Sequence, residues 1–169
     1  MGVAFVPPDR QHMGLLMNFT VSENLIGKSF DRPPFSKYGF LQKQAIENFC
    51  AGAIHRCDIR TPHAHVPVKL LSGGNQQKVV LSKWLVSRVK VLVMLHPTRG
   101  IDVGAKQEIY RLIRDLSKQG IGMIILGDSF EEDIGLAHKI LVMKDGRVQT
   151  VLDATESKPT PADVLQYVV

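Results

Sequence analysis

Residues 71–78 read Leu-Ser-Gly-Gly-Asn-Gln-Gln-Lys, and they are the strongest indication of the fold in the sequence. Two glycines, Gly73 and Gly74, stand at the start of a helical pattern, where backbone N–H groups can close on a phosphate. The pattern Gly-x-x-x-x-Gly-Lys-Ser/Thr, which holds a nucleotide within its own chain, does not occur in the 169 residues. The stretch therefore predicts only part of a phosphate site.

Hydrophobic patterns that follow this stretch predict an α/β fold. Residues 74–88 carry the apolar stripe of an amphipathic helix. Uninterrupted apolar runs at 91–95 and 123–126 are typical of buried parallel strands, and between them Asp102 can cap a helix that ends at Gly120. We expect helix and buried strand to alternate in the second half of the chain, as they do around a parallel sheet.

Shorter signals define the remaining elements, and they make the first half mostly helical. The expected elements are a strand at 3–6, a short helix capped by Ser22, a proline-containing loop at 30–37, a helix at 41–54, a hairpin turn at Asp145-Gly146 and a last helix from Ala162.

The composition is that of an ordinary globular chain, with 44% hydrophobic and 22% charged residues. No apolar stretch approaches the ~20 residues that span a bilayer, and Met1-Gly2-Val3 leads directly into a strand-like run, so we expect neither a membrane span nor a signal peptide. The net charge of +5 is scattered along the chain, which favours a solvated basic surface over a nucleic-acid interface. Two cysteines fit a reducing compartment.

A second motif joins the first, because residues 97–106 read Pro-Thr-Arg-Gly-Ile-Asp-Val-Gly-Ala-Lys. With residues 71–78 it closely resembles the ATP-binding cassette of ABC transporters, and specifically the ATPase subunits of simple-sugar importers of the ribose, galactose or xylose type. These subunits fuse two cassettes, and this chain is most similar to the C-terminal part of the second. The resemblance covers nearly the whole chain.

The resemblance implies a fold and a division of the chain. The fold is a partial P-loop NTPase-type (ABC ATPase) sheet with a helical subdomain. Residues 1–169 would form a single incomplete ABC ATPase domain. Its parts are a helical signature subdomain at about 12–88, a sheet core at 1–11 and 89–151, and a C-terminal tail helix within 152–169.

The resemblance also implies how the motifs work. In this family two cassettes pair head to tail, and each ATP lies between the P-loop of one cassette and the signature of the other. Ser72, Gly73, Gly74 and Gln76 would accordingly contact a nucleotide in trans, with the helix dipole favouring its anionic phosphates. Asp102 matches the aspartate of the loop that crosses the dimer interface. ATP and Mg²⁺ would be held by the partner subunit.

Four positions depart from the family pattern. Pro8 stands in the loop that senses the γ-phosphate, where proline has neither a side-chain acceptor nor an N–H. Leu95 and His96 replace the Asp-Glu pair that orients Mg²⁺ and activates water. His96 could take a proton, but without the metal carboxylate a passive replacement is favoured.

The fourth departure is Asp128, which stands at the switch position after the second predicted strand. A carboxylate there would repel a γ-phosphate, and we favour a simpler role as the cap of a helix through Glu131 and Glu132. The resemblance is to an ATPase, but the P-loop and both acidic residues of the Walker B strand are missing. We therefore expect no hydrolysis in cis and a signature offered to a partner's site.

By resemblance, the chain would couple ATP binding and hydrolysis to carbohydrate import. Its partners would be a second ATP-binding cassette, membrane permease subunits and, indirectly, a periplasmic or extracellular sugar-binding protein, with no nucleic acid. Its location would be cytoplasmic, peripheral on the inner face of the cell membrane.

Two alternatives stay open on the sequence. The chain could be a non-catalytic interaction protein or a truncated remnant of such an ATPase, since a missing central strand would leave sheet edges unpaired. A weaker alternative is a metal-binding module, although the spacing of its candidate ligands fits no common zinc pattern and packing of the cysteines in the core is favoured. The candidate ligands are Cys50, His55, Cys57, His63 and His65.

Overall fold

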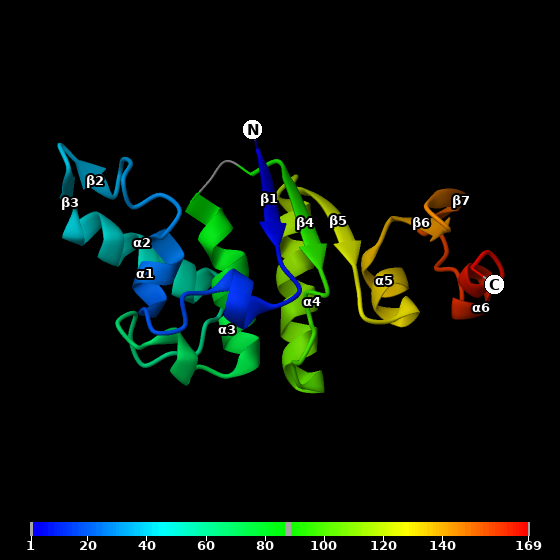
Figure 1. Ribbon diagram of the computed structural model, residues 1–169, viewed down its shortest axis with the longest axis horizontal. Helices are drawn as coiled ribbons and strands as arrows, with labels where there is room; N and C mark the ends of the chain where they lie inside the picture. Colours follow the sequence, from blue (N-terminus) through cyan, green and yellow to red (C-terminus); the bar gives the residue numbers. More distant parts are fainter. Residues whose placement is uncertain (1, 87–88, 169) are drawn as a thin grey trace. The chain divides into compact units, whose positions relative to one another are not determined.

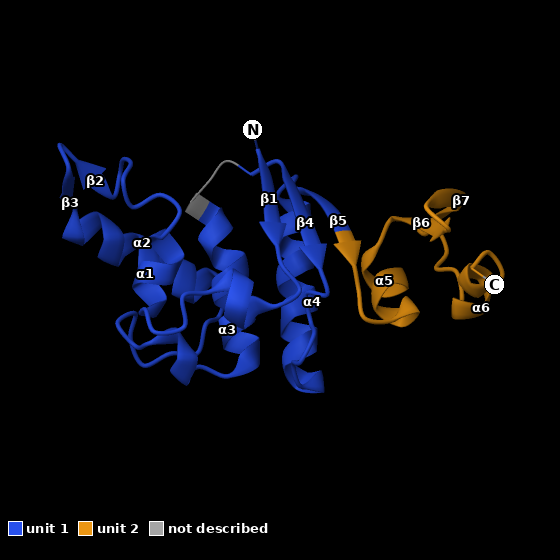
Figure 2. Ribbon diagram, viewed as in Figure 1, with its two compact units in different colours: residues 1–124 blue, residues 125–169 orange. Residues whose placement is uncertain are grey.

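The computed structural model describes residues 2–86 and 89–168. It divides into two compact units, residues 1–124 and 125–169 (Figure 2). Among the described residues, no helix combines the length and the apolar character needed to cross a bilayer.

A three-stranded sheet forms the centre of the first unit (Figure 1). Its order is β1 (Val3–Val6), β4 (Val91–Leu95) and β5 (Gly122–Leu126). β1 and β4 pair in parallel with Val3 opposite Val91, and all three arrows point the same way in Figure 1. Pairing of the first strand with one from the middle of the chain confirms the predicted parallel α/β sheet.

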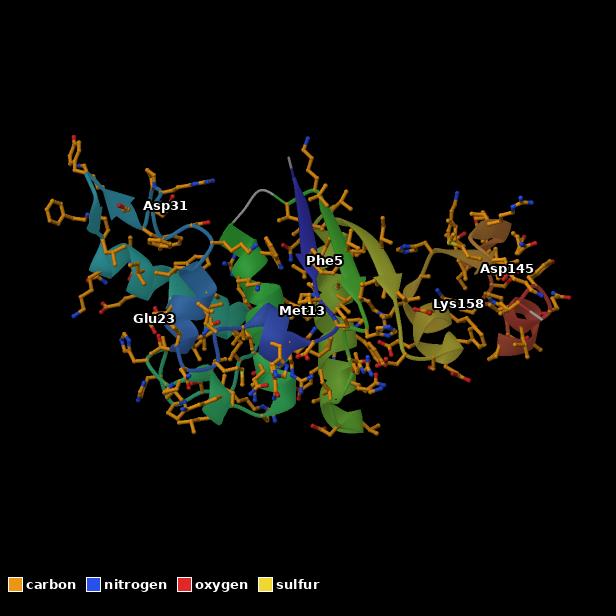
Figure 3. The ribbon with its side chains drawn as sticks, viewed as in Figure 1. Phe5, Met13, Glu23, Asp31, Asp145 and Lys158 are labelled. Carbon is orange, nitrogen blue, oxygen red and sulfur yellow. The ribbon has the colours of Figure 1, made fainter. Side chains whose placement is uncertain are left out.

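The sheet is buried on alternate residues, which corrects the expectation of strands buried on both faces. Val6, Leu92 and Met94 are buried, as parallel strands under a helix should be. Val3 is 61% exposed, and Phe5, labelled in Figure 3, is 42% exposed. The register places these two residues on one face.

The last strand of this sheet departs most from the prediction. β5 begins at Gly122, one residue before the predicted apolar run, and its side chains are exposed or half-buried. Ile124 is 63% exposed. An apolar run predicts a buried strand only where helices cover both faces of the sheet, and the apolar pattern does not report what covers them.

The connection between β4 and β5 is α4 (Val103–Lys118), the predicted helix. Asp102 is its N-cap and accepts a hydrogen bond from the N–H of Ala105 at 2.9 Å. Gly120, just beyond the end of α4, has φ +87°, the left-handed conformation that ends many helices. Ile109 and Ile113 are buried, so α4 presents its apolar stripe to the core.

The helical part of the first unit lies between β1 and β4. Its elements are a π-helical turn (Arg10–Gly14), α1 (Val21–Ile26), a small hairpin of β2 (Ser36–Lys37) and β3 (Phe40–Leu41), α2 (Lys43–Arg56), a 3-10 turn (Val68–Leu70), α3 (Gly73–Ser82) and a second 3-10 turn (Lys83–Val86).

α1 and the helix predicted for 74–88 differ from the sequence expectation. α1 is capped by Thr20, which forms a capping box with Glu23, so the expected cap Ser22 is wrong; Ser22 is buried in the first turn. The helix predicted for 74–88 is α-helical only to Ser82. Its last two predicted residues, 87 and 88, lie outside the described residues.

The second unit contains α5 (Phe130–Leu136), β6 (Lys139–Lys144), β7 (Arg147–Asp153) and α6 (Pro161–Leu165). β6 and β7 form the predicted antiparallel hairpin. Asp145, labelled in Figure 3, and Gly146 have φ +50° and +73°, as a primed turn requires. The last helix starts at Pro161 rather than at Ala162, behind the cap Thr160. The hairpin and helices of this unit bury a shared cluster that includes Ile134, Ile140, Val142, Ala154 and Val164.

Candidate functional site

The start of α3 presents the residues of the first motif. Ser72 is the N-cap with extended backbone angles, φ −61° and ψ 157°, and its side chain is exposed. Within the described residues, this side chain accepts no hydrogen bond from the first turn of α3. The first-turn N–H groups of a helix have no intrahelical partner, so this end of α3 offers donors and a positive dipole.

The two glycines are required by close contacts rather than by turn geometry. A Cβ on Gly73 would lie 2.6 Å from the Arg10 guanidinium and 3.3 Å from the carbonyl oxygen of Gly100. A Cβ on Gly74 would lie 2.7 Å from the Cβ of Ala105 on α4. The start of α3 thus packs directly against both the loop before α4 and the first turn of α4.

These contacts bring the beginnings of α3 and α4 to one open hollow of about 250 Å³. Its lining consists of Arg60, Ser72, Gly74, Asn75, Asp102, Gly104, Ala105 and Glu108. Two helix N-termini therefore face the same space. The dipole of α3 favours an anion there, while the Asp102 carboxylate already caps the positive end of α4. The structure brings together Ser72, Gly74 and Asp102, three of the residues singled out from the sequence.

Hydrogen bonds and ion pairs connect several of the residues that line this hollow. The backbone N–H of Arg60 donates to Asn75 Oδ1 at 2.8 Å, and Asn75 Nδ2 donates to Ser72 Oγ at 3.0 Å. The Arg60 guanidinium reaches Glu108 Oε1 at 2.7 Å, and Lys78 Nζ lies 2.8 Å from Glu108 Oε2. Sequence reasoning missed Arg60, Asn75 and Glu108; Asn75 lies inside the motif, while Arg60 and Glu108 carry no local signal.

Gln76 lies inside the protein. It is 3% exposed, and its Nε2 donates to the carbonyl oxygens of Leu71 at 3.1 Å and Val68 at 3.4 Å. Its Oε1 accepts from Arg10 Nε at 3.4 Å. The Arg10 guanidinium also donates to the carbonyl of Arg99 at 2.7 Å. Gln76 therefore joins the start of α3 to the loop before α4, and it does not line the hollow.

The residues at the altered positions follow the carboxyl ends of the strands. Pro8 comes after β1, and Leu95 and His96 come at the end of β4. His96 is half-buried and has φ +49°, an unusual backbone conformation for a residue other than glycine. The Leu95 side chain has no oxygen to offer a magnesium ion. Among the described residues, no group of three or more His, Cys, Asp or Glu side chains is placed to hold a metal ion.

The capping role expected for Asp128 is wrong. Ser129 is the N-cap of α5, and its hydroxyl accepts from the N–H of Glu132 at 3.3 Å. Asp128 stands one position earlier, where its backbone N–H donates to Glu132 Oε2 at 3.4 Å. Serine and aspartate are both good caps, and the backbone angles rather than the residue type select between neighbours.

Both cysteines are buried. Cys50 Sγ lies 3.2 Å from Ser22 Oγ in a buried contact. Burial raises the pKa of both the Cys50 and Cys57 thiols, which disfavours the thiolate that a metal would need. The side chains therefore serve as small core residues, and His63 and His65 only approach each other, with ring centroids 6.2 Å apart.

The fold is that of an ATP-binding cassette. The structure resembles a nucleotide-free ATP-binding cassette from an ABC transporter with a TM-score of 0.75 at 19% identity, covering 98% of this chain and 65% of that one. A second cassette of an ABC transporter, in its ADP conformation, matches with a TM-score of 0.73 at 21% identity and the same coverage. The α/β cassette fold expected from the sequence is confirmed.

Sequence comparison narrows the class, and the chain is a relative of the ATP-binding proteins of ribose and galactose importers. It is 40% identical to the ribose import ATP-binding protein RbsA of Shouchella clausii (strain KSM-K16) over 155 residues, 92% of this chain and 31% of that protein. It is 39% identical to the galactose/methyl galactoside import ATP-binding protein MglA of Clostridium tetani (strain Massachusetts / E88) over 166 residues, 98% of this chain and 32% of that protein.

The chain spans about a third of the length of the curated relatives it matches. A scan against models of protein families gives no match. The resemblance to simple-sugar importers that the two motifs indicated is confirmed by these relatives.

Proposed function

We propose that this chain is an ATP-binding-cassette component of a carbohydrate import system, and that it contributes residues 71–78 to an ATP site of a partner cassette. Its similarity to ribose and galactose import ATP-binding proteins supports the first part. One observation carries the second part: Ser72 and Gly74 at the start of α3 share an open hollow with Asp102 at the start of α4.

Each residue has a physical role in this proposal. ATP held by the partner supplies a γ-phosphate anion. The Ser72 hydroxyl and the N–H groups of Gly73 and Gly74 donate to that anion, and the dipole of α3 favours it. Asp102 keeps α4 capped in the loop that faces the partner. Gln76, buried behind the motif, holds the turn in place rather than contacting the nucleotide.

We propose that the chain alone does not hydrolyse ATP. Leu95 and His96 stand where Mg²⁺ orientation and water activation need carboxylates. Pro8 offers no side-chain acceptor to a water or a metal, and Asp128 would place a negative charge at the switch position. ATP and Mg²⁺ would be bound by the partner's own phosphate-binding loop.

Partners and location follow from the same assignment. We propose that residues 1–169 are the signature-bearing part of a cassette that pairs with a second cassette and docks on permease subunits at the cytoplasmic face of the membrane. The helical region, residues 12–88, would face the permease. A sugar-binding protein on the outer side would be reached only through the permease, and no nucleic acid is involved.

The test mixes the full chain with a P-loop-containing cassette of a related sugar importer. The partner is loaded with Mg²⁺ and the slowly hydrolysed ATP analogue AMP-PNP, and complex formation is followed by sedimentation velocity. We expect a complex that depends on the nucleotide, and we expect phosphate release by the chain alone to equal that of buffer.

A matched pair of substitutions makes the test specific. Ser72→Arg puts a long side chain into the hollow and should abolish the nucleotide-dependent complex. Ser157→Arg changes an exposed serine outside the site and should leave the complex unchanged. If the purified chain hydrolyses ATP and Ser72→Arg abolishes this hydrolysis, the proposal that the chain is inactive in cis is wrong. A complex that forms equally without nucleotide would sink the proposal of a shared ATP site.

A second candidate function is a non-catalytic interaction protein, and the exposed sheet face favours it. Val3, Phe5 and Ile124 expose 61%, 42% and 63% of their surface on strands of a parallel sheet, a type of sheet that is normally covered on both faces. Binding that needs no nucleotide, survives Ser72→Arg and is lost in Phe5→Lys would favour this candidate over the first.

A further inference from the structure

Asn75 stands between Arg60 and Ser72, and its amide has one possible orientation. The backbone N–H of Arg60 can only donate, so the Asn75 atom 2.8 Å from it is the acceptor Oδ1. The Nδ2 group is then directed to Ser72 Oγ at 3.0 Å. The hydrogen-bond network therefore fixes which end of the carboxamide meets the serine.

This orientation sets the direction of the Ser72 hydroxyl. A serine hydroxyl has one proton and two acceptor lone pairs. When Oγ accepts from Asn75 Nδ2, its own proton remains available to donate elsewhere. Ser72 is exposed and lines the hollow, so a phosphate oxygen, which can only accept, would meet the donor side of the hydroxyl.

The hydrogen bonds from the Arg60 N–H through Asn75 to Ser72 form a relay, and ion pairs that include the buried Lys78 hold its Arg60 end. The Arg60 guanidinium donates to Glu108 Oε1 at 2.7 Å, which ties the loop before the motif to α4. The second oxygen of Glu108 pairs with Lys78 Nζ at 2.8 Å, and the Lys78 side chain is 2% exposed. Lys78 also pairs with Asp58 Oδ2 at 3.3 Å. Lys78 and Glu108 therefore tie both Asp58 and Arg60 to the helices α3 and α4, close to the Arg60 N–H.

We infer that Asn75 is a positioning residue that presents the Ser72 hydroxyl as a donor to the γ-phosphate bound by a partner cassette, with Arg60 and Glu108 holding Asn75 in that orientation. The inference rests on the proposed function and adds the residue that prepares Ser72 for it. Asparagine suits this place because it accepts at one end and donates at the other.

An aspartate at this position would reverse the relay. Its carboxylate would accept from the Arg60 N–H and also from the Ser72 hydroxyl, because it has no proton to give. The serine would then turn a lone pair toward the incoming phosphate, and the added negative charge would repel it. Asn75→Asp should therefore impair binding more than Asn75→Leu, which keeps the shape and only removes both hydrogen bonds.

The experiment is a double-mutant cycle on the nucleotide-dependent complex with the AMP-PNP-loaded partner cassette. We expect Ser72→Ala to weaken the complex about 10- to 100-fold, since it removes a hydrogen bond to a charged acceptor. Asn75→Leu should weaken it about 5- to 20-fold, but change it less than about twofold when Ser72 is already alanine. Asn48→Leu, at an exposed asparagine of α2, is the matched control and should have no effect.

Two outcomes separate the relay from the proposed function. If the wild-type chain binds and the losses of affinity caused by Ser72→Ala and Asn75→Leu multiply in the double variant, Asn75 has only a structural role. That outcome overturns the relay but leaves the proposed function standing. If the wild-type chain forms no nucleotide-dependent complex, the shared ATP site and the positioning role fall together.

The free chain gives an independent readout by NMR. Ser72→Ala should shift the side-chain amide resonances of Asn75, and Asn75→Leu should speed hydrogen exchange at the Arg60 backbone amide. Unchanged spectra and exchange in both variants would overturn the relay, whatever the chain binds.

Discussion

Gly74 of α3 packs against Ala105 of α4 so closely that a Cβ placed on Gly74 would lie only 2.7 Å from the Cβ of Ala105. Gly74→Ala should therefore push the two helices apart and lower the free energy of unfolding by about 1–3 kcal/mol, the usual cost of overpacking. Urea denaturation measures the change. Ala105→Gly in the same chain should recover part of the loss by removing the opposing methyl group.

Gly52 is the matched control for this substitution. It lies within α2, and a Cβ placed on it would meet no atom within 4 Å among the described residues. Gly52→Ala should stabilise the chain by up to about 1 kcal/mol, because alanine is the better helix former. Equal losses in both variants would mean that helix contact at Gly74 does not limit the packing.

Lys78 and Glu108 form an ion pair in which the lysine side chain is 2% exposed. Glu108→Ala should lower the free energy of unfolding by about 1–3 kcal/mol, because the buried Lys78 then keeps Asp58, an exposed residue at 3.3 Å, as its charged partner. The double variant Lys78→Met with Glu108→Leu should lose less than Glu108→Ala alone, since replacing both members of a buried pair is often close to neutral. If the loss of unfolding free energy in the double variant equals the sum of the losses from changing Lys78 and Glu108 one at a time, the two residues are not coupled.

Burial, with help from the charge of Lys28, lowers the pKa of Lys83 from 10.5 to about 8. Between pH 8 and 10.5 the folded state has released this proton while the unfolded chain retains it, so the contribution of Lys83 to stability rises with pH and is lost as the pH falls through 8. The expected contribution is at most about 3 kcal/mol at 1.36 kcal/mol per pH unit.

Lys83→Met isolates that contribution. The buried thiols of Cys50 and Cys57 have raised pKa values and act in the opposite sense, because they stay protonated in the folded state at a pH where the unfolded chain has lost those protons. The free energy of unfolding of the wild type should therefore increase relative to that of Lys83→Met as the pH rises from 7 to 10. Urea denaturation at each pH measures this difference. A flat difference would contradict the lowered pKa.

Thr20 caps α1, and its backbone N–H and side chain both bond to Glu23, which lowers the pKa of that carboxyl. Thr20→Ala should cost about 1 kcal/mol of stability and raise the pKa of Glu23 toward its ordinary value. NMR titration of Glu23 checks the second effect. Ser22→Ala should leave the Glu23 pKa unchanged, because Ser22 bonds to Cys50 instead.

The sequence predicted elements best where the signal is local. The turn at Asp145-Gly146 and the cap at Asp102 were both found where expected, because the residues that form each feature are neighbours in the chain. Thr20 could also have been found, since Thr20 and Glu23 have the spacing of a capping box. The caps at Ser22 and Asp128 were wrong because another capping residue, Thr20 or Ser129, lies within two positions, and the sequence does not give the backbone angles that select between them.

Burial was predicted less well than secondary structure. The apolar run 123–126 does lie in a strand, but Ile124 is exposed. A run of apolar residues favours a strand, whereas the exposure of its side chains depends on whether another element covers that face of the sheet. That information is not contained in the strand's own residues.

The candidate site was predicted in part. Ser72 and Asp102 could be singled out from their motifs, and they line one hollow. The contact between Arg60 and Glu108 joins residues 48 positions apart, so no local pattern announces it. Asn75 and Gln76 are adjacent, yet one faces the hollow and the other the core, and a periodicity of 3.6 residues cannot decide between neighbours when both are polar amides.

The pairing of β1 with β4 has a consequence for how the chain is made. Val3 pairs with Val91, 88 positions later. At synthesis rates of roughly 5–20 residues per second, a ribosome needs roughly 4 to 18 seconds to produce the partner of the first strand. During that interval the apolar segment at 3–6 lacks β4, its partner in the folded sheet, so we expect chaperones to bind this segment on the nascent chain. The yield of folded protein should then depend on the speed of translation as well as on the stability of the finished fold.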